Sequence, residues 1–536
     1  MQPPERWRAG VLAGLAIVTL VAALGVLLAP VLAQDPVVSW PRAGQLAHST
    51  VLPLVPYRPL SLSARVPCAA LSALDRRPDG GDALRTLPAT AGKPGIVGQG
   101  LVVAVRRGVV RVSASGATLL REPLPSGGCT YQVLADAGGV RVLRDGMRQG
   151  SVTPKGAVAL EVPEVSELAT DAEGQLASAG LAVSLHTDAR YESTPTALKI
   201  GLLVVCGAAL LALLTLAWRW WGGQGARLEH PRLQHPSLQH PRPAVADAVL
   251  VVVSAVWVLL APTNFDDAWY LLMARGADVS GSVGNAIYMF NVTENPFVAS
   301  QYVLQAWGEL GQLLGADWGL TWMRLVPLAY GLATWLLLRV LLVAGLGPEL
   351  GTGRAAWALL IAYLLWWLPY GMTLRPEPLI VLLAAATLLL AELARSRGSV
   401  GALALATATT ALALSVSPSG LVAAAPLVLA LPWLWRWLRA RTALDRVAAV
   451  LLLAASATSL VLVGFADATL GDVLESTAVH QMYYQTFSWY QENVHYQTIL
   501  SFKDSSQWAR RAPVLLTIAV LLVVAVGSIR RGWTDL

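Results

Sequence analysis

The fold is organised around the stretch TNFDDAWYLLMARGADVSGSVGNAIYMFNVTENPFVASQ, residues Thr263–Gln301. It follows an apolar run at Ala244–Ala261 and opens with two adjacent carboxylates, Asp266 and Asp267. Charges at a membrane boundary are costly unless they are solvated or functional. The pair therefore indicates either a helix cap, with Asp266 as N-cap and Asp267 in the first turn, or a site of chemistry. Both can hold, because a cap can present the neighbouring carboxylate to a substrate.

Composition places this stretch in a membrane protein. Of the 536 residues, 55% are hydrophobic and 13% are charged, whereas soluble domains usually carry about 25% charged residues. The length leaves room for one soluble domain besides the spans. The formal net charge is +6, and arginine supplies most of the positive charge. These arginines follow the predicted topology and do not gather on one basic face, which argues against nucleic-acid binding.

The apolar stretches predict about ten membrane spans, since a span needs about 20 mainly apolar residues. The first stretch follows Arg6 and Arg8 and resembles a signal peptide. It is longer than the usual signal core, which favours an uncleaved span. The expected spans are Ala9–Ala33, Leu198–Trp221, Ala244–Ala261, Trp318–Leu342, Ala355–Pro369, Pro376–Leu393, Ala402–Val416, Leu421–Leu434, Arg446–Phe465 and Pro513–Val526.

Arginine placement predicts the orientation of these spans. With the N-terminus in the cytoplasm, every inner segment carries at least two arginines, as the positive-inside bias requires. The soluble segment is then extracytoplasmic, together with four polar loops. Those loops are Thr263–Asp317, Tyr370–Arg375, Ser417–Gly420 and Ala466–Ala512.

The soluble segment has the pattern of an antiparallel β-sandwich. Stretches at Gly100–Ser115, Tyr131–Gly146 and Leu176–Asp188 indicate strands separated by turn residues. Cys68 and Cys129 lie in this segment and are disulfide candidates if it is extracytoplasmic, whereas an unpaired state stays open.

The resulting domain order places the sandwich between the first two spans. It consists of a cytoplasmic N-terminus and first span at 1–33, the carbohydrate-binding-like sandwich at 34–197, the second span at 198–221, a cytoplasmic linker at 222–243 and a multi-span core at 244–536. In the linker, His-Pro recurs at His230, His235 and His240. Metal binding is the alternative there, but a semi-rigid basic linker is favoured because proline disfavours helix in the preceding residue.

Three further outer elements accompany the aspartate pair. TLRPEPL, Thr373–Leu379, holds Arg375 and Glu377, which are typical of an interfacial arginine with a helix-capping glutamate or of an arginine aimed at a phosphate. SVSPSG, Ser415–Gly420, predicts a tight turn. The aromatic loop His480–Arg511 combines the features of an interfacial belt and of a sugar-stacking platform. Its candidates are Trp489, Tyr490, Glu492 and the outward pair Arg510 and Arg511, which suits an anionic partner.

These pieces resemble the cell-wall arabinosyltransferases of mycobacteria and corynebacteria, the Emb family of ethambutol targets. The matching motifs are DDAWYLLMAR, ENPF, LRPEP, SPSG and WYQE…DSSQWARR, in this order along the chain. The resemblance implies a polytopic α-helical membrane protein with a GT-C-like core and a β-sandwich inserted between spans 1 and 2. It also implies residence in the plasma membrane with an extracytoplasmic active site.

The resemblance further implies an inverting transfer from a lipid-borne sugar. The donor would be decaprenyl-phosphoryl arabinofuranose, a co-substrate, and the acceptor an arabinan of arabinogalactan or lipoarabinomannan. No resident cofactor or metal site is expected, although a divalent cation stays open, and a homo- or heterodimer is expected. A general base must deprotonate the acceptor hydroxyl. By analogy Asp266 is this base, Asp267 and Glu294 position sugar hydroxyls, Arg375, Arg510 and Arg511 stabilise the leaving phosphate, and Met273 falls in the drug-contact region.

Two departures keep alternatives open. Family members are longer, with further spans and a C-terminal carbohydrate-binding domain, so the chain is expected to be a short or N-terminal-half member. Ser417 stands where a histidine is expected. The alternative is a non-catalytic, glycan-binding membrane subunit that partners a full-length enzyme. A transporter is disfavoured because the spans carry few ionisable residues at their centres.

Overall fold

The computed structural model describes residues 6–52, 54, 57–88, 99–152, 161–174, 176–222, 241–264, 266–284, 292–346, 353–483, 515, 518, 519 and 522. They form two compact units. The β unit comprises residues 33–192 in the main, and the helical unit comprises the chain before and after it. The two are described separately below.

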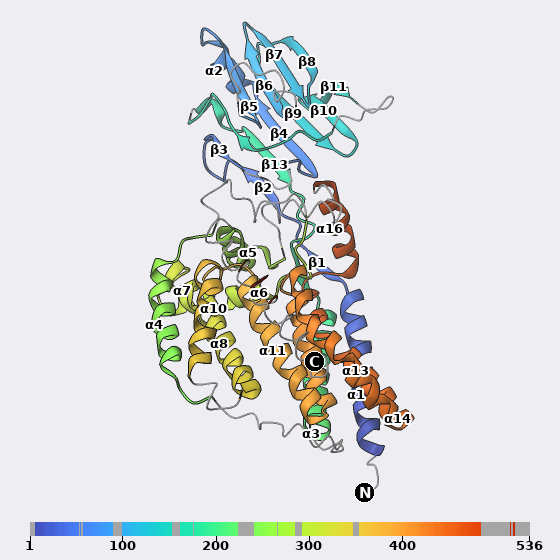
Figure 1. Ribbon diagram of the computed structural model, residues 1–536. Helices are drawn as coiled ribbons and strands as arrows, with labels where there is room; N and C mark the ends of the chain where they lie inside the picture. The colour runs from blue at the N-terminus through green and yellow to red at the C-terminus, as the bar shows by residue number, and fades with distance from the viewer. Residues whose placement is uncertain are drawn as a thin grey trace. The chain divides into compact units, whose positions relative to one another are not determined.

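The β unit contains two larger antiparallel sheets (Figure 1). One has the strand order β11-β10-β9-β4-β13-β2 and the other β5-β6-β7-β8; β3 pairs with β12. The strands are β2 (Val37–Trp40), β3 (Thr50–Val51), β4 (Ser61–Pro67), β5 (Gly81–Arg85), β6 (Leu101–Arg106), β7 (Val109–Ala114), β8 (Ala117–Pro123), β9 (Thr130–Asp136), β10 (Gly139–Arg144), β11 (Met147–Val152), β12 (Glu167–Leu168) and β13 (Ala182–His186). Helix α2 (Cys68–Asp75) and the 3-10 turn η1 (Leu176–Ser178) complete the unit, and β1 (Val31–Ala33) pairs with β14 (Ser193–Pro195).

Alternating side chains build the core between the two larger sheets. Residues of β4 and β9 alternate between buried and partly exposed, the period that a half-buried strand requires. Buried Val66, Val133, Val103 and Val112 come from both sheets and belong to one apolar cluster. The predicted antiparallel sandwich is therefore present, since the two inner faces pack on each other.

Two of the three predicted strand stretches turn out to be hairpins. Gly100–Ser115 forms β6 and β7 with a turn at Arg107 (φ 51°) and Gly108 (φ 71°). Positive φ at both central positions gives the turn type that matches the twist of paired strands. Tyr131–Gly146 forms the hairpin of β9 and β10, whereas Leu176–Asp188 contains the strand β13 after a 3-10 turn.

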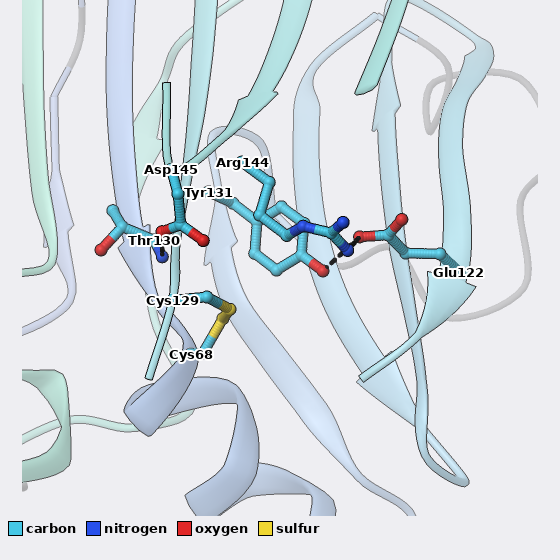
Figure 2. Close-up of a disulfide and its surroundings, with 7 residues drawn as sticks. All are labelled: Cys68, Glu122, Cys129, Thr130, Tyr131, Arg144 and Asp145. Carbon is cyan, nitrogen blue, oxygen red and sulfur yellow. Dashed lines mark hydrogen bonds and ion pairs between the residues drawn. A yellow bond between two sulfur atoms is a disulfide. The ribbon is translucent and has the colours of Figure 1, made fainter. Parts of the chain in front are cut away.

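A disulfide joins Cys68, at the start of α2, to Cys129, just before β9, with Cα atoms 5.1 Å apart (Figure 2). Beside it, fully buried Tyr131 donates to Glu122 at 2.6 Å, and Arg144 donates to the same oxygen at 2.8 Å. Burial and the hydrogen bond to Glu122 raise the pKa of Tyr131. Because Glu122 lies on β8 and Tyr131 on β9, this contact ties the two sheets together.

Removing the disulfide should lower the stability of the β unit. The cross-link closes a loop with a sequence separation of 61, for which loop-closure entropy predicts a loss of about 4 kcal/mol. Thermal unfolding of the purified chain in detergent should shift down for Cys68→Ser with Cys129→Ser. Adding reductant should lower the wild-type midpoint but not that of the double variant. Cys206→Ala, at the buried free cysteine, is the matched control and should keep the reductant sensitivity; a midpoint unmoved by reductant in the wild type would contradict the prediction.

The helical unit consists of a bundle of apolar helices with shorter helices at the ends. Its elements are α1 (Arg6–Leu28), α3 (Ala197–Trp221), α4 (Val245–Leu260), α5 (Asp267–Ser280), α6 (Ala299–Leu313), α7 (Leu320–Met323), α8 (Leu325–Leu346), α10 (Arg354–Tyr370), α11 (Glu377–Arg397), α12 (Val400–Leu414), η2 (Pro418–Ala424), α13 (Ala425–Arg439), α14 (Ala443–Ser456), α15 (Ser459–Gly464) and α16 (Leu470–Tyr483).

Three apolar clusters hold these helices together. One joins α1, α3, α11, α12, α13 and α14, through residues such as Leu12 and Leu213. A second joins α4, α8 and α10, which lie side by side in Figure 1, through Trp335 and Trp367. The third joins α5, α6, α7 and α8 around Trp318. The third cluster fixes α5, the helix that opens with the aspartate pair.

The predicted span count is only partly met among the described residues. Six helices there are long and apolar enough to cross a membrane, and α4 and α12 are apolar but shorter. Helix α10 matches the expected span Ala355–Pro369 and has 17 residues. The first helix ends at Leu28, so the prediction that its span reaches Ala33 is wrong, because Val31–Ala33 is a strand. The last predicted span, Pro513–Val526, lies almost entirely outside the described residues.

Candidate functional site

The aspartate pair lies where α5 meets the turn before α11. Asp267 starts α5, and its carboxylate accepts the backbone N–H of Asn264 at 3.0 Å and that of Leu374 at 2.8 Å. Asp266 occupies the N-cap position, but its side chain makes no capping hydrogen bond. The expectation that Asp266 is the capping side chain is therefore wrong. Asp267 ties the helix to a distant turn, and the Asp266 carboxylate is left to face the neighbouring arginine.

Arg375 lies between two carboxylates. Its NH1 group is 3.0 Å from Asp266, and its Nε and NH2 groups donate to Glu377 at 3.1 and 2.7 Å. Burial works against the charged form, but the pairs with Glu377 and Asp266 prevail and raise the pKa of Arg375. Arg375 is thus fully ionised and shared between the N-terminus of α5 and the first turn of α11. We call these three residues the Arg375 cluster.

The local sequence places Glu377 in this cluster. Helix α11 begins at Glu377 between two prolines, ends with Arg395 and Arg397, and is followed by left-handed Gly398. Prolines near the start, a carboxylate in the first turn and arginines in the last are the arrangement that helix geometry and the helix dipole favour. The glutamate therefore has a structural reason to be here, and it also orients the guanidinium of Arg375.

The Arg375 cluster is accessible, whereas its support is buried. The side chains of Asp266, Arg375 and Glu377 are 37%, 36% and 41% exposed, but Asp267 is 6% exposed. Burial raises the pKa of Asp267 even though the two backbone N–H groups and nearby Arg324 and Arg375 oppose it. The two adjacent aspartates therefore differ in their environment, since Asp266 is accessible and Asp267 is buried.

Tyr270 lies one helical turn beyond the pair and connects the cluster to Glu294. Burial, and after it the Glu377 carboxylate, raise the pKa of Tyr270 to about 12; Arg375 opposes this shift, and Glu294 and Asp266 add smaller contributions to it. The carboxylates of three separate chain segments therefore act on one phenol. Glu294, predicted from the ENPF motif, belongs to the same neighbourhood as the Arg375 cluster.

The raised pKa of Asp267 predicts a pH dependence of stability. Because the folded protein holds this proton more tightly than the unfolded chain, protonation favours folding. The contribution is present below the ordinary Asp pKa of 3.8 and is lost as pH rises through the raised value. In thermal unfolding, the midpoint of the wild type minus that of Asp267→Asn should fall as pH rises through this window. A difference that stays constant or increases would contradict the assignment.

Buried Arg324 supports the same region and was not predicted from the sequence. It is 4% exposed and donates to the carbonyl oxygens of Val258 at 3.0 Å, Ala261 at 2.8 Å and Pro262 at 3.1 Å. These are orphan acceptors at the C-terminus of α4, where a cation is favoured. Its position at a predicted outer boundary, against the positive-inside bias, is the signal that could have found it.

Asp467 is a second buried carboxylate that the sequence did not single out. It is 4% exposed and accepts the side-chain N–H of Asn295 at 2.7 Å, the hydroxyl of Ser282 at 3.1 Å and the N–H of Val283 at 3.3 Å. It thus joins the loop after α5 to the turn that carries Glu294. A lone aspartate at the end of an apolar run was the available signal.

Loss of the Asp467 side chain should destabilise the helical unit. Asp467→Ala leaves three buried donors without their partner, each costing on the order of 1–3 kcal/mol. Asp472→Ala is the matched control, because Asp472 caps α16 through its bonds with Thr469 and such a cap contributes about 1 kcal/mol. Thermal unfolding in detergent should show the larger shift for Asp467→Ala; equal shifts would contradict the role of the network.

The SVSPSG turn packs against the start of α6, which follows the ENPF motif. The N–H of Ala299, which starts α6, donates to the carbonyl of Ser415 at 3.0 Å. A Cβ at Gly420 would lie 1.9 Å from the Ala413 carbonyl oxygen, so glycine is required there. Ser417 precedes η2, and its hydroxyl accepts that of Ser419 at 3.2 Å. The turn therefore has a structural role, and Ser417 contributes to it through its bond with Ser419.

The remaining predicted residues fall into two groups. Met273 of α5 is 3% exposed, so its side chain is buried, and its place in a drug-contact region stays a prediction. Trp489, Tyr490, Glu492, Arg510, Arg511 and the histidines of the linker lie outside the described residues. Within the described part of the chain, no three His, Cys, Asp or Glu side chains come together as metal ligands.

The comparisons with known proteins cover nearly the whole chain. Residues 194–535 match the family described as "Mycobacterial cell wall arabinan synthesis protein", and residues 33–190 match the "Arabinosyltransferase concanavalin like domain". The chain is 31% identical over 98% of its length to the probable arabinosyltransferase B of Mycobacterium avium, covering 48% of that protein. It is 32% identical over 94% of its length to the probable arabinosyltransferase A of Mycobacterium tuberculosis, covering 46% of it.

A solved structure gives the same result for the fold. The cryo-EM structure of arabinosyltransferase EmbB from Mycobacterium smegmatis has 27% identity and a TM-score of 0.67, and the match covers 88% of this chain and 45% of that one. The chain thus spans about half the length of the relatives that it matches. A GT-C-like membrane fold with a concanavalin-like β domain is therefore confirmed, and the chain belongs to the mycobacterial cell-wall arabinan synthesis family.

Proposed function

We propose that this protein is an arabinosyltransferase that moves arabinofuranose from a polyprenyl-phosphate donor to a growing arabinan of arabinogalactan or lipoarabinomannan. The observation that carries the proposal is the ion pair of Asp266 with Arg375, which lies in the segment that matches the arabinan synthesis family. A carboxylate and an arginine are the two groups that this transfer requires: one for the acceptor proton and one for the leaving phosphate.

In the proposed step, the acceptor hydroxyl attacks the anomeric carbon as the bond from that carbon to the donor phosphate oxygen breaks. The hydroxyl proton passes to Asp266, and the electron pair leaves with the polyprenyl phosphate. One displacement inverts the anomeric centre. Asp266 suits the role of base because its side chain is accessible. Asp267 suits a positioning role, because backbone N–H groups occupy both of its oxygens.

Arg375 links donor binding to the freeing of the base. Its guanidinium is paired with Asp266 and Glu377, so an arriving phosphate competes with these carboxylates. Arginine binds phosphate oxygens strongly through paired N–H groups. If the phosphate takes the NH1 group, Asp266 is released from its ion pair and becomes available to the acceptor hydroxyl at the moment when the donor is in place. Glu377 would hold Arg375 in position during the exchange, and Glu294 would orient a sugar hydroxyl.

The finer topology belongs to the same proposal. Phosphate-linked lipid donors serve reactions outside the cytoplasm, where nucleotide sugars are absent. We therefore place the Arg375 cluster on the outer face of the plasma membrane, with the N-terminus in the cytoplasm. The aromatic loop with Trp489, Tyr490 and Glu492 would bind the acceptor glycan, and Arg510 and Arg511 would add positive charge for the lipid phosphate. The transfer assay also tests whether activity requires a related arabinosyltransferase as a dimer partner or a divalent cation.

The test compares membranes that contain the wild type, Asp266→Asn or Arg375→Gln, with synthetic decaprenyl-phosphoryl arabinofuranose and an oligoarabinan acceptor. Transfer should fall by at least about 100-fold for Asp266→Asn, the lower range for loss of a general base. The Arg375→Gln variant should lose transfer and also require more donor for half saturation. Folding is monitored by thermal unfolding, which Asp266→Asn should leave unchanged because its side chain is partly exposed.

The matched control is Glu392→Gln. Glu392 pairs with Arg395 at 3.0 and 2.7 Å at the opposite end of α11, so it has the same chemistry as Glu377 outside the cluster. Its activity should equal that of the wild type. Absence of transfer by the wild type, alone and with a full-length family member, would overturn the enzyme and favour a glycan-binding subunit. Full activity of Asp266→Asn would overturn only the assignment of the base.

A further inference from the structure

The outer face of the four-stranded sheet of the β unit carries a hollow of about 1150 Å³. This volume exceeds the ~300–1,000 Å³ of typical small-molecule sites, so it fits a chain of several units. Arginines stand around a floor of small side chains. The residues that define this basic hollow are Pro78, Asp79, Asp82, Gly100, Val102, Ala104, Arg106, Arg107, Val109, Arg111, Ser113, Gly116 and Arg121.

Strand register places the charges in one row across the sheet. Asp82 of β5 pairs with Ala104 of β6, Ala104 pairs with Arg111 of β7, and Arg111 pairs with Arg121 of β8. Residues in such a row share one face of the sheet. Like charges directly opposite each other destabilise a strand pair. The two arginines therefore stand where the fold alone gives no reason for them.

Neighbouring groups leave the charge of this row uncompensated. Arg106 is paired with Asp82 at 2.8 Å, which uses the carboxylate of the row. Arg111 donates to the hydroxyl oxygens of Ser113 at 3.1 Å and Thr118 at 3.0 Å, which hold its guanidinium without neutralising it. Among the described residues, no carboxylate forms an ion pair with Arg111 or Arg121. An anionic group that reaches both arginines would relieve their repulsion.

We propose that the basic hollow binds an acidic oligosaccharide, with Arg111 and Arg121 holding its carboxylate or phosphate groups. Arginine forks match the planar oxygen pairs of such groups. Asp79 lies in the same hollow, where its carboxylate would accept hydrogen bonds from sugar hydroxyls. The lining residues include no aromatic side chain for stacking a neutral sugar, so charge sets the selectivity. The site lies in the β unit, apart from the Arg375 cluster of the helical unit, and goes beyond the proposed transfer.

The experiment measures binding to the full chain in detergent by calorimetry. The probes are tetragalacturonate, neutral maltotetraose of the same length, inorganic phosphate and vesicles containing phosphatidylglycerol. Tetragalacturonate should bind at least tenfold more tightly than maltotetraose, and its affinity should fall as salt screens the charges. Arg111→Gln with Arg121→Gln should weaken it at least tenfold, and Arg121→Gln alone should weaken it less. Removing the like-charged pair should not lower the unfolding midpoint, which reports on folding.

The matched control is Arg65→Gln. Arg65 is an exposed arginine on β4 of the other sheet, and its loss should leave tetragalacturonate binding unchanged. Equal weakening by Arg65→Gln would overturn the site, because net charge would then explain the binding. Equal affinity for maltotetraose and tetragalacturonate would also overturn the site. The same holds if phosphate or the vesicles bind through the two arginines and tetragalacturonate does not bind. Transferase activity is measured separately, so a lack of transfer would not be mistaken for a lack of oligosaccharide binding in the basic hollow.

Discussion

The Arg375 cluster depends on the buried carboxylate of Asp267, which accepts the N–H of Asn264 before α5 and that of Leu374 in the turn before α11. Residues 267 and 374 are far apart in sequence, and the backbone N–H of Leu374 has no helical partner at this point. A buried carboxylate that accepts two N–H groups fixes both segments, but burial also raises its pKa. Together with the apolar cluster that contains Ala274 and Leu374, this bond sets the distance between Asp266 and Arg375. Asp267 is therefore the buried support, whereas Asp266 is accessible, as the proposed base has to be.

Other buried charges in the helical unit follow the same rule. Arg324 donates to the free carbonyls at the end of α4. Lys199 donates to the carbonyls of Val26, Ala29 and Ala468. Asp467 accepts the side-chain N–H of Asn295, next to Glu294. Each satisfies backbone or side-chain groups that an apolar environment would leave without partners. These residues make loops rigid near the ends of apolar helices. The Arg375 cluster differs because its three charged side chains remain more than one-third exposed.

The β unit shows the same contrast between structural and unassigned charge. Glu122 has a structural role between the two sheets, where it accepts hydrogen bonds from Tyr131 and Arg144. Arg111 and Arg121 are opposed on the outer face, where the fold gains nothing from them. The first arrangement explains why a glutamate is tolerated beside a buried tyrosine. The opposed arginines have no such structural explanation, and for this reason we propose that they bind an acidic glycan.

The sequence by itself determined the broad architecture, because its signals are periodic and local. Apolar runs predicted most helices of the bundle, strand alternation predicted the sandwich, and the motifs DDAWYLLMAR, ENPF and LRPEP indicated the family. Only the tertiary structure decided which aspartate is buried, that Met273 is not on the surface, and that Arg375 bridges Asp266 and Glu377. Asp267, Arg324 and Asp467 acquire their roles from partners far away in the chain. No local pattern encodes such partners, because they depend on how the helices pack.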